Sequence, residues 1–230
     1  PDDELDNARL LYLNYPSNPL GAVADKEFFD RTVAWFKGTK TRIVHDFAYA
    51  PFSFEGRHPI ILESDPHLEC AIEIYSLSKG FNMSGFRVGF AVGNHEMIEA
   101  INTYQDHTQT GMWGVLQDAS IAALENAGEI LPHQEEKFRR RSALVTGAFK
   151  EMGIPINPIR GGIFGWIRVP EGHDGESFRE FLMKEQSILV TPGIPFGSRG
   201  SGYIRISLAV RDQMLEDVIS RFGNIRHLWQ

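Results

Sequence analysis

The chain has 230 residues, of which 42% are hydrophobic and 23% charged, and its formal net charge is −7. This composition is typical of a folded globular protein and excludes a disordered or collagen-like chain. The acidic excess provides no electrostatic footprint for nucleic acid or for an anionic membrane surface, so neither is predicted as a partner.

Cysteine usage and the start of the chain both bear on its location. Cys70 is the single cysteine, so no disulfide can form within the chain, and a reducing compartment is favoured. Uninterrupted apolar runs are far shorter than the ~20 residues of a membrane-spanning helix. The acidic segment Pro1–Glu4 also lacks the basic and apolar stretches of a signal peptide. We therefore predict a cytoplasmic protein.

The first half of the chain alternates short apolar runs with stretches of helical period. This pattern is typical of βαβ units and predicts an α/β fold with a mostly parallel sheet. A helix is predicted to begin after Asp25, which suits an N-cap, and to end at Gly38. Strands are predicted at residues 9–14, 41–44, 71–77 and 87–92, and two more helices near residues 95–104 and 113–126.

The second half of the chain changes in pattern beyond Gly128, which we expect to end the preceding helix. A long polar helix is predicted over residues 132–152. The elements predicted after it are strands at residues 163–169, 188–190 and 203–207, and helices at residues 175–185 and 214–222. This order predicts two domains, residues 1–128 and a smaller α+β domain of residues 129–230.

Polar residues follow the predicted strands of the first half. Ligands of open α/β sheets bind at the carboxyl ends of the parallel strands. Taken singly, each of these residues is explained as a turn former, a helix cap or a solvated surface group. Taken together, they predict a ligand site, and they are Asn18, Asp46, Tyr49, Ser76, Lys79 and Arg87.

Several motifs resemble those of the class I/II aminotransferases, which are pyridoxal-phosphate (PLP) enzymes of the aspartate-aminotransferase fold (fold type I). They are NYPSNPLG (14–21), DFAY (46–49), SLSK (76–79), GFRVG (85–89), GGIF (161–164) and YIRIS (203–207). Leu20 is a departure, because the family often has Thr there. The resemblance implies that residues 1–128 form the C-terminal half of a large PLP-binding domain, with helices on both faces of its sheet. It also implies that the N-terminal part of the family is absent from this sequence.

The resemblance also implies roles at the cofactor ring. Lys79 would form a Schiff base with PLP and move a proton during the reaction. Asp46 would pair with the pyridine nitrogen. Tyr49 and Asn18 would form hydrogen bonds with the ring hydroxyl.

Anion binding is implied at three further positions. Ser76 and Arg87 would hold the cofactor phosphate, the arginine through a charge-assisted pair of hydrogen bonds. Arg205 would bind the α-carboxylate of the substrate, because the planar guanidinium suits a carboxylate better than an ammonium group does. Asn18 is implied at the substrate as well as at the cofactor.

The implied activity is a ping-pong exchange of the amino group between an L-amino acid and a 2-oxo acid. Residues 71–75, 88–94 and 100–107 look like those of methionine-salvage transaminases. A PLP-dependent C–S lyase remains an alternative, as does an aminotransferase-like ligand-sensing domain of a transcription regulator. A homodimer is expected, because sites of this family are completed by the neighbouring subunit.

Other features of the sequence favour structural explanations. The glycine-rich segment 197–202 lacks the strand–turn–helix context of a phosphate loop and is expected to be a turn. The basic run 137–141 follows two glutamates and predicts a solvated, salt-bridged helix face. The histidines show no metal-binding spacing, so no metal site is predicted. His45 fits either a position behind the cofactor or a satisfied core histidine.

Overall fold

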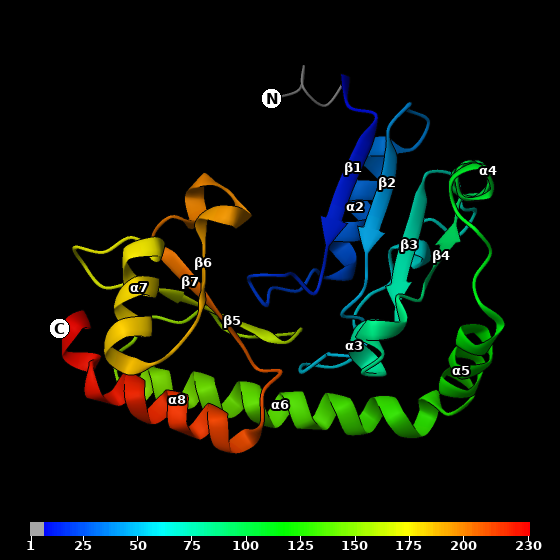
Figure 1. Cartoon of the computed structure of the whole chain (residues 1–230). Coiled ribbons are helices and arrows are strands. Elements are labelled where there is room, and N and C mark those ends of the chain that lie inside the picture. The colour runs from blue at the N-terminus through cyan, green and yellow to red at the C-terminus, as the bar shows by residue number, and fades with distance from the viewer. Residues whose placement is uncertain (1–6) are drawn as a thin grey trace. The chain divides into compact units, whose positions relative to one another are not determined.

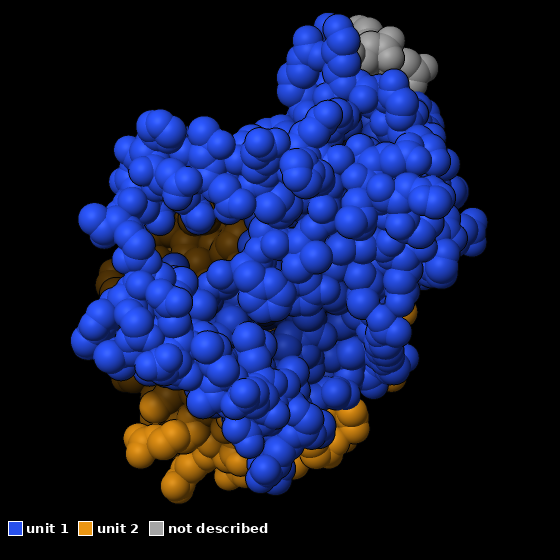
Figure 2. Space-filling view, turned by 90° about the vertical axis from the view of Figure 1, so that its right-hand side faces the viewer, with its two compact units in different colours: residues 1–16, 23–135 blue, residues 17–22, 136–230 orange. Residues whose placement is uncertain are grey.

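A computed structural model describes residues 7–230, which fall into two compact units. Unit 1 comprises the described part of residues 1–16 together with residues 23–135, and unit 2 comprises residues 17–22 and 136–230 (Figures 1 and 2). The division into a cofactor-binding domain, residues 1–128, and a small domain, residues 129–230, stays a prediction.

Unit 1 is built on a four-stranded sheet in the order β1-β2-β3-β4. Its strands are β1 (Leu10–Asn14), β2 (Arg42–Asp46), β3 (Ala71–Ser76) and β4 (Gly89–Gly93). The first three strands run parallel, whereas β4 runs antiparallel to β3. The mostly parallel sheet expected from the sequence is therefore confirmed, and each strand begins and ends within two residues of its predicted bounds.

Helix α2 (Lys26–Phe36) covers one face of this sheet (Figure 1). It begins after Asp25, whose carboxylate accepts a hydrogen bond from the Phe28 amide at 2.8 Å, so the predicted N-cap is confirmed. Burying each large apolar side chain of such a helix contributes roughly 1.5–3 kcal/mol. The buried cluster between helix and sheet includes Phe29, Val33, Phe36, Ile43 and Ala71.

The remaining helices of unit 1 are α3 (Leu77–Gly80), α4 (His95–Thr108) and α5 (Gly114–Glu125). Helix α4 begins after Asn94, whose Oδ1 accepts a hydrogen bond from the Met97 amide at 3.1 Å. It continues four residues beyond its predicted end. None of the helices within residues 7–230 is long and apolar enough to cross a membrane.

Helix α6 (Ala127–Glu151) runs through the boundary between the two units and contains both Gly128 and Pro132. The preceding helix α5 ends at Glu125, close to the predicted break, but α6 already begins at Ala127, so the predicted start at residue 132 is wrong. Gly128 is the second residue of the helix, where its amide has no intrahelical partner in any case. Pro132 lacks an amide hydrogen, but this loss near the helix start leaves most of the helix intact.

Unit 2 contains a three-stranded antiparallel sheet in the order β5-β7-β6. The strands are β5 (Phe164–Arg168), β6 (Thr191–Pro192) and β7 (Tyr203–Ser207). The strand predicted at residues 188–190 is wrong, because pairing with β7 begins only at Thr191. Ile188 and Val190 are buried while Leu189 is 75% exposed, so this segment has the alternation of a strand without its ladder.

The helices of unit 2 pack around a core rich in phenylalanine. They are α7 (Gly175–Gln186) and α8 (Asp212–Asn224), with the short 3-10 segments η3 (Ile194–Phe196), η4 (Ser198–Gly200) and η5 (Arg226–Trp229). The rings of Phe149 in α6 and Phe222 in α8 lie 4.9 Å apart, and both side chains are fully buried. The glycine-rich segment 197–202, expected to be a turn, contains the single 3-10 turn η4.

The basic run on α6 is only partly solvated. Arg139 pairs with Glu136 at the surface, as predicted. Arg141 is buried, and it donates hydrogen bonds to Asp212 Oδ1 at 2.7 Å and to the Leu208 carbonyl at 2.9 Å. This pairing with Arg141 lowers the pKa of the Asp212 carboxyl. The expectation of a solvated face is therefore wrong at Arg141, which ties α6 to the start of α8.

Candidate active site

The carboxyl ends of β1 and β2 bring Asn14 and Asp46 together in unit 1. The two residues are paired in register, and Asn14 Nδ2 donates a hydrogen bond to the Asp46 carbonyl at 3.0 Å. The Asp46 side chain is exposed, and its Oδ1 accepts a hydrogen bond from the Ala48 amide at 3.1 Å. Asp46 therefore ends its strand in a local turn that orients the carboxylate.

Tyr49 lies three residues beyond Asp46, in the turn that follows β2. Its side chain is buried, with 6% of its surface exposed, and its carbonyl accepts a hydrogen bond from the Phe52 amide at 2.9 Å. The turn that carries Asp46 thus also anchors an aromatic hydroxyl at the same end of the sheet.

Strand β3 leads directly into α3, which carries Lys79. Ser76 is the N-cap of this helix, and its Oγ accepts a hydrogen bond from the Ser78 amide at 3.2 Å. Lys79 is half-buried, and within residues 7–230 its Nζ makes no hydrogen bond or ion pair. At Gly80 a Cβ atom would lie 2.8 Å from the side chains of both Pro51 and Leu131. The helical turn that carries Lys79 is therefore closely packed at Gly80.

Arg87 comes beside this turn through the antiparallel pairing of β3 and β4. Ser76 pairs with Gly89, and the Leu77 amide donates to the Val88 carbonyl at 3.1 Å. Arg87 has a left-handed backbone with φ 57°, and its Nη1 donates to the Ser84 carbonyl at 3.1 Å. The exposed guanidinium and the Ser76 hydroxyl thus come from adjacent segments.

Asn18 and Arg205 meet in unit 2. Arg205 Nη1 donates a hydrogen bond to Asn18 Oδ1 at 2.7 Å, and Nη2 lies 3.4 Å from Thr191 Oγ1. The guanidinium carbon also lies 4.1 Å from the ring centroid of Phe164 and 4.8 Å from that of Phe196, within the range of cation–π attraction. Arg205 is therefore held by both hydrogen bonds and aromatic rings.

The segment that carries Asn18 is fastened to unit 2 by its backbone. The Gly21 carbonyl accepts hydrogen bonds from the Arg160 and Gly161 amides at 3.0 and 3.1 Å. Gly21 has φ 66°, and a Cβ atom there would lie 3.2 Å from the Ile159 Cα atom. Glycine is required at this position both for the left-handed backbone and for the close approach.

The structure sorts the seven predicted site residues into two groups. Five lie at one end of the sheet of unit 1, and Asn18 and Arg205 contact each other in unit 2. Thr191 and Phe196 also contact Arg205 and were not predicted from the sequence. Phe196 lies in the PGIPFG segment (192–197), but no local pattern indicates that its ring faces the arginine.

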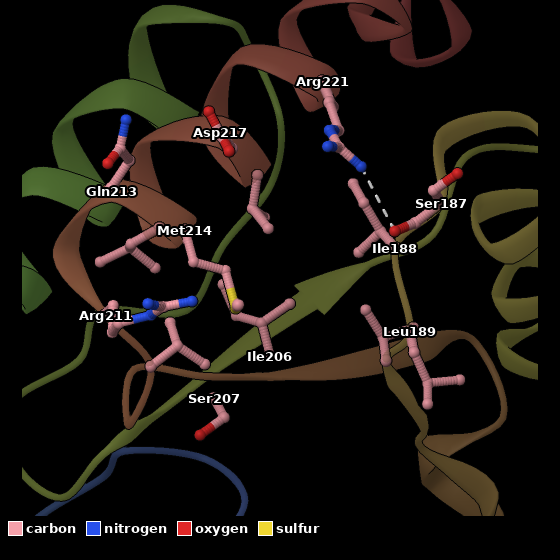
Figure 3. Close-up of a pocket in the computed structure, with 14 residues that line it drawn as sticks. Ser187, Ile188, Leu189, Ile206, Ser207, Arg211, Gln213, Met214, Asp217 and Arg221 are labelled. Atoms are coloured by element: carbon pink, nitrogen blue, oxygen red, sulfur yellow. Dashed lines mark hydrogen bonds between the residues drawn. The ribbon is translucent and has the colours of Figure 1, made fainter.

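A separate cavity of about 610 Å³ opens in unit 2 between α8 and the segment before β6 (Figure 3). Its wall is mainly apolar and includes Leu189, Ile206 and Met214. Arg221 reaches across one end and donates a hydrogen bond to the Ser187 carbonyl at 3.3 Å. None of the seven predicted site residues lines this cavity.

Comparison with known families assigns the chain. Residues 2–222 match the family described as aminotransferase class I and II. Because the match covers most of the sequence, the chain belongs to this family, whose members generally depend on pyridoxal phosphate. The resemblance detected in the motifs is thus confirmed.

Individual relatives agree with this assignment. The chain is 40% identical to the L-glutamine–4-(methylsulfanyl)-2-oxobutanoate aminotransferase of Bacillus subtilis, over 96% of this chain and 56% of the relative. It is 35% identical to an LL-diaminopimelate aminotransferase of Dehalococcoides mccartyi, over 98% of this chain and 58% of the relative. The chain therefore spans little more than half the length of these relatives.

A solved structure supports the fold. An aminotransferase from Staphylococcus aureus superposes with a TM-score of 0.98 at 48% identity, covering 100% of this chain and 61% of that one. The predicted fold class, part of a type I PLP-dependent transferase, is confirmed by this agreement.

Proposed function

We propose that the chain carries the reactive lysine and the substrate-binding arginine of a PLP-dependent aminotransferase, which exchanges an amino group between an L-amino acid and a 2-oxo acid. One observation carries the proposal. In a member of the aminotransferase family, Asp46 and the Ser76–Lys79 turn follow adjacent parallel strands at the same edge of the sheet. That edge is where open α/β sheets bind their ligands.

The donor set of unit 1 suits this cofactor. Lys79 offers an amine for the aldehyde, and Asp46 offers a carboxylate for the pyridine nitrogen. Ser76 and Arg87 offer a hydroxyl and a guanidinium for the phosphate, and they come from adjacent segments. When bound, PLP supplies an electron sink for negative charge that develops at the substrate Cα atom.

The residues of unit 1 act on this group in distinct ways. The Lys79 amine would hold the cofactor by its aldehyde and would move the proton of the substrate Cα atom. Asp46, oriented by the Ala48 amide, would pair with the pyridine nitrogen. Tyr49 is assigned to the ring hydroxyl, and we propose Asn18 as a residue that binds both cofactor and substrate.

Arg205 binds the substrate α-carboxylate in this proposal. A guanidinium presents five N–H donors in a fixed plane. Asn18 and Thr191 each contact one side-chain nitrogen of Arg205, which fixes the plane that the guanidinium presents to a carboxylate. The adjacent rings of Phe164 and Phe196 hold the guanidinium in place through cation–π attraction.

The relatives indicate a class of substrate. A relative at 40% identity is named for 4-(methylsulfanyl)-2-oxobutanoate, which agrees with the likeness to methionine-salvage transaminases. We therefore propose this oxo acid as the acceptor. An LL-diaminopimelate aminotransferase at 35% identity makes dicarboxylic amino acids the comparison set for an assay.

A homodimer and a cytoplasmic location belong to the same proposal. Trp113 and Tyr104 are 68% and 67% exposed, and Val115 and Ile121 on α5 are 53% and 54% exposed. Large apolar side chains that are exposed in one chain are candidates for an interface between subunits. Sedimentation of the purified chain at several concentrations tests this assembly, and a monomer at every concentration would contradict it.

The test of the proposed activity is spectroscopic. The purified chain is incubated with PLP, and its visible absorption is recorded before and after an amino acid is added. Borohydride reduction followed by peptide mapping then locates the bound cofactor. We expect a band that bleaches with the amino acid and a label on Lys79. A label on another lysine would contradict the assignment, and a stable band with no response to any amino acid would favour a sensing role.

A further inference from the structure

A buried polar pair lies on the face of the unit 1 sheet opposite to the Asp46 side chain. Successive residues of a strand point to opposite faces, so His45 and Asp46 project from opposite sides of β2. His45 is paired in register with Glu73 of β3, and both residues are completely buried. His45 Nδ1 lies 3.2 Å from Glu73 Oε1.

The hydrogen bonds of this pair fix its protons. His45 Nε2 lies 2.9 Å from the Tyr15 carbonyl, and since a carbonyl only accepts, Nε2 carries a hydrogen. Glu73 Oε1 also accepts from the Ile61 amide at 2.7 Å, and Oε2 accepts from the Tyr75 hydroxyl at 2.7 Å. The contact between Nδ1 and Oε1 therefore requires one further proton, which the two side chains share.

The His45 ring is also fixed by packing. It is stacked on Phe47 with 4.8 Å between centroids, and it contacts Phe29 at 5.0 Å. The Phe47 amide donates to the Ile74 carbonyl at 2.9 Å, so the chain remains attached to β3 just beyond Asp46. The residues on both sides of Asp46 are thus anchored on the face that Asp46 does not occupy.

Asp46 itself is exposed and has little side-chain support of its own. Its Oδ1 accepts a hydrogen bond from the Ala48 amide, and the carboxylate otherwise depends on where β2 places its backbone. A carboxylate that acts on a bound ring has to be held to within about 0.5 Å, which is normally achieved by supporting residues. The buried pair supplies such support from the opposite face.

We propose that His45 and Glu73 are positioning residues for Asp46, which hold its carboxylate in place through the backbone of β2. The inference rests on the proposed function, in which Asp46 pairs with the pyridine nitrogen of the cofactor. It also resolves the two interpretations of His45 left open by the sequence, because His45 is a satisfied core histidine that acts on the site through its neighbour.

Glu73→Gln is the most direct way to break the pair. One atom of residue 73 has to accept from the Ile61 amide and also complete the contact with His45. An amide oxygen there accepts from Ile61 but faces the lone pair of a neutral His45, and an amide nitrogen faces the Ile61 N–H. No neutral amide satisfies both neighbours, so the variant loses the hydrogen bond between His45 and residue 73.

Asp65→Asn is the matched control. Asp65 is another buried carboxylate of unit 1, and it accepts three backbone hydrogen bonds from residues 69–71. Its loss also destabilises the unit, but it has no contact with β2 at Asp46. A difference between the two variants therefore separates positioning from stability.

Amide hydrogen exchange tests the inference without the cofactor. In the full chain, Glu73→Gln is expected to raise the exchange of the Ala48 amide roughly tenfold relative to the other amides of the sheet. Asp65→Asn is expected to leave this ratio unchanged. Equal ratios in wild type and Glu73→Gln would overturn the inference.

PLP itself is the second probe. Glu73→Gln is expected to weaken PLP binding about tenfold and to shift the pH at which the bound chromophore changes colour, whereas Asp65→Asn leaves both unchanged. In the double variant His45→Phe/Glu73→Gln, the new phenylalanine ring is expected to pack between Phe29 and Phe47 and to restore the free energy of unfolding. It is expected to keep the altered PLP binding, because the tie to Tyr15 is lost. Recovery of PLP binding together with stability would overturn the inference.

The two proposals fail in different ways. Wild type that binds no PLP on Lys79, with Ala48 exchange still altered by Glu73→Gln, would contradict the proposed function and leave the support of Asp46 intact. Wild type that binds PLP on Lys79, with Glu73→Gln behaving like Asp65→Asn, would contradict the positioning role alone.

Discussion

Two arginines assigned to bind anions are held in different ways by the two units. Arg205 in unit 2 is half-buried, its Nη1 is fixed by Asn18, and two aromatic rings lie close to its guanidinium. Arg87 in unit 1 is exposed, and its side chain donates to the carbonyl of Ser84, three residues earlier. Only the first arginine has its orientation determined by distant parts of the sequence.

This difference matches the anions that the two residues are proposed to bind. A carboxylate is planar and requires two donors in one plane, so an arginine oriented in advance saves the entropy of ordering it. A phosphate accepts hydrogen bonds from many directions, so an arginine held only by a neighbouring turn is sufficient. The contrast predicts that Arg205 of unit 2 acts through its fixed orientation, whereas Arg87 of unit 1 acts mainly through its positive charge.

Replacement of Lys79 is expected to have the largest effect. Lys79→Ala removes the amine that we propose carries the proton, and transamination should fall by about 10²–10⁴-fold. The label left by borohydride should disappear as well. The fold should be unaffected, since within residues 7–230 the Lys79 amine makes no ion pair. Lys40→Ala, a change at an exposed lysine of the same unit, is the control and should retain activity and label.

Arg205→Lys tests the geometric role of unit 2. Lysine keeps the charge but loses the fork and the contact with the two rings, which should cost about 2 kcal/mol, or roughly 30-fold in kcat/KM for both substrates. Binding of PLP should not change. Steady-state kinetics with amino acid and oxo acid measure the effect, and Arg168→Lys, on the exposed side of β5, is the matched control. A loss confined to one of the two substrates would contradict a shared carboxylate site.

Asp65 provides a prediction for the stability of unit 1. Burial tends to raise the pKa of this carboxyl, but the hydrogen bonds from residues 69–71 outweigh it and lower the pKa below its ordinary value. The contribution to stability is therefore complete above a pH near 4 and is lost as the pH falls through the folded-state pKa. Asp65→Asn should lower the free energy of unfolding by about 1–3 kcal/mol at pH 7.

Denaturant unfolding across pH measures this effect. The difference between wild type and Asp65→Asn should shrink as the solution is acidified below pH ~4, since the protonated wild-type side chain loses the same ionic hydrogen bonds. In Asp65→Asn, the amides of the unit 1 sheet should lose protection from hydrogen exchange, whereas the amides of the unit 2 sheet should keep theirs. A difference that grows in acid would contradict the assigned direction of the pKa shift.

The sequence predicts the parts of the molecule that depend on local pattern. The strands of unit 1 were predictable because each contains a short apolar run that ends in polar or glycine residues, and the residues that follow β2 and β3, such as Tyr49 and Lys79, could be ordered along one edge. The start of α6 was mispredicted at residue 132 rather than Ala127, because the penalty for glycine is small at a helix end and a local pattern does not show where the helix starts.

Contacts between distant segments could not be predicted from the sequence. His45 and Glu73 are 28 residues apart, and their pairing follows from the register of β2 with β3. The contact of Phe196 with Arg205 likewise depends on how η3 and β7 pack. The motif identified Arg205, but the groups that orient it belong to tertiary structure. Motifs therefore predict which residues belong to the site, while tertiary contacts determine how firmly each side chain is held.

Arg87→Lys should have the smallest effect and is the sharpest test of the contrast between the two arginines. Both side chains carry one positive charge, and both residues meet the same cost at the left-handed backbone position, where φ is 57°. If phosphate binding needs charge more than a fixed fork, PLP affinity should fall only about threefold, against the roughly 30-fold loss expected from Arg205→Lys. Fluorescence titration with PLP measures the change, and Arg87→Gln, which removes the charge, should lose considerably more. A loss for Arg87→Lys as large as that for Arg87→Gln would mean that the planar fork is needed in unit 1 as well, and that Arg87 is oriented by the ligand after binding as firmly as Arg205 is oriented by Asn18 before it.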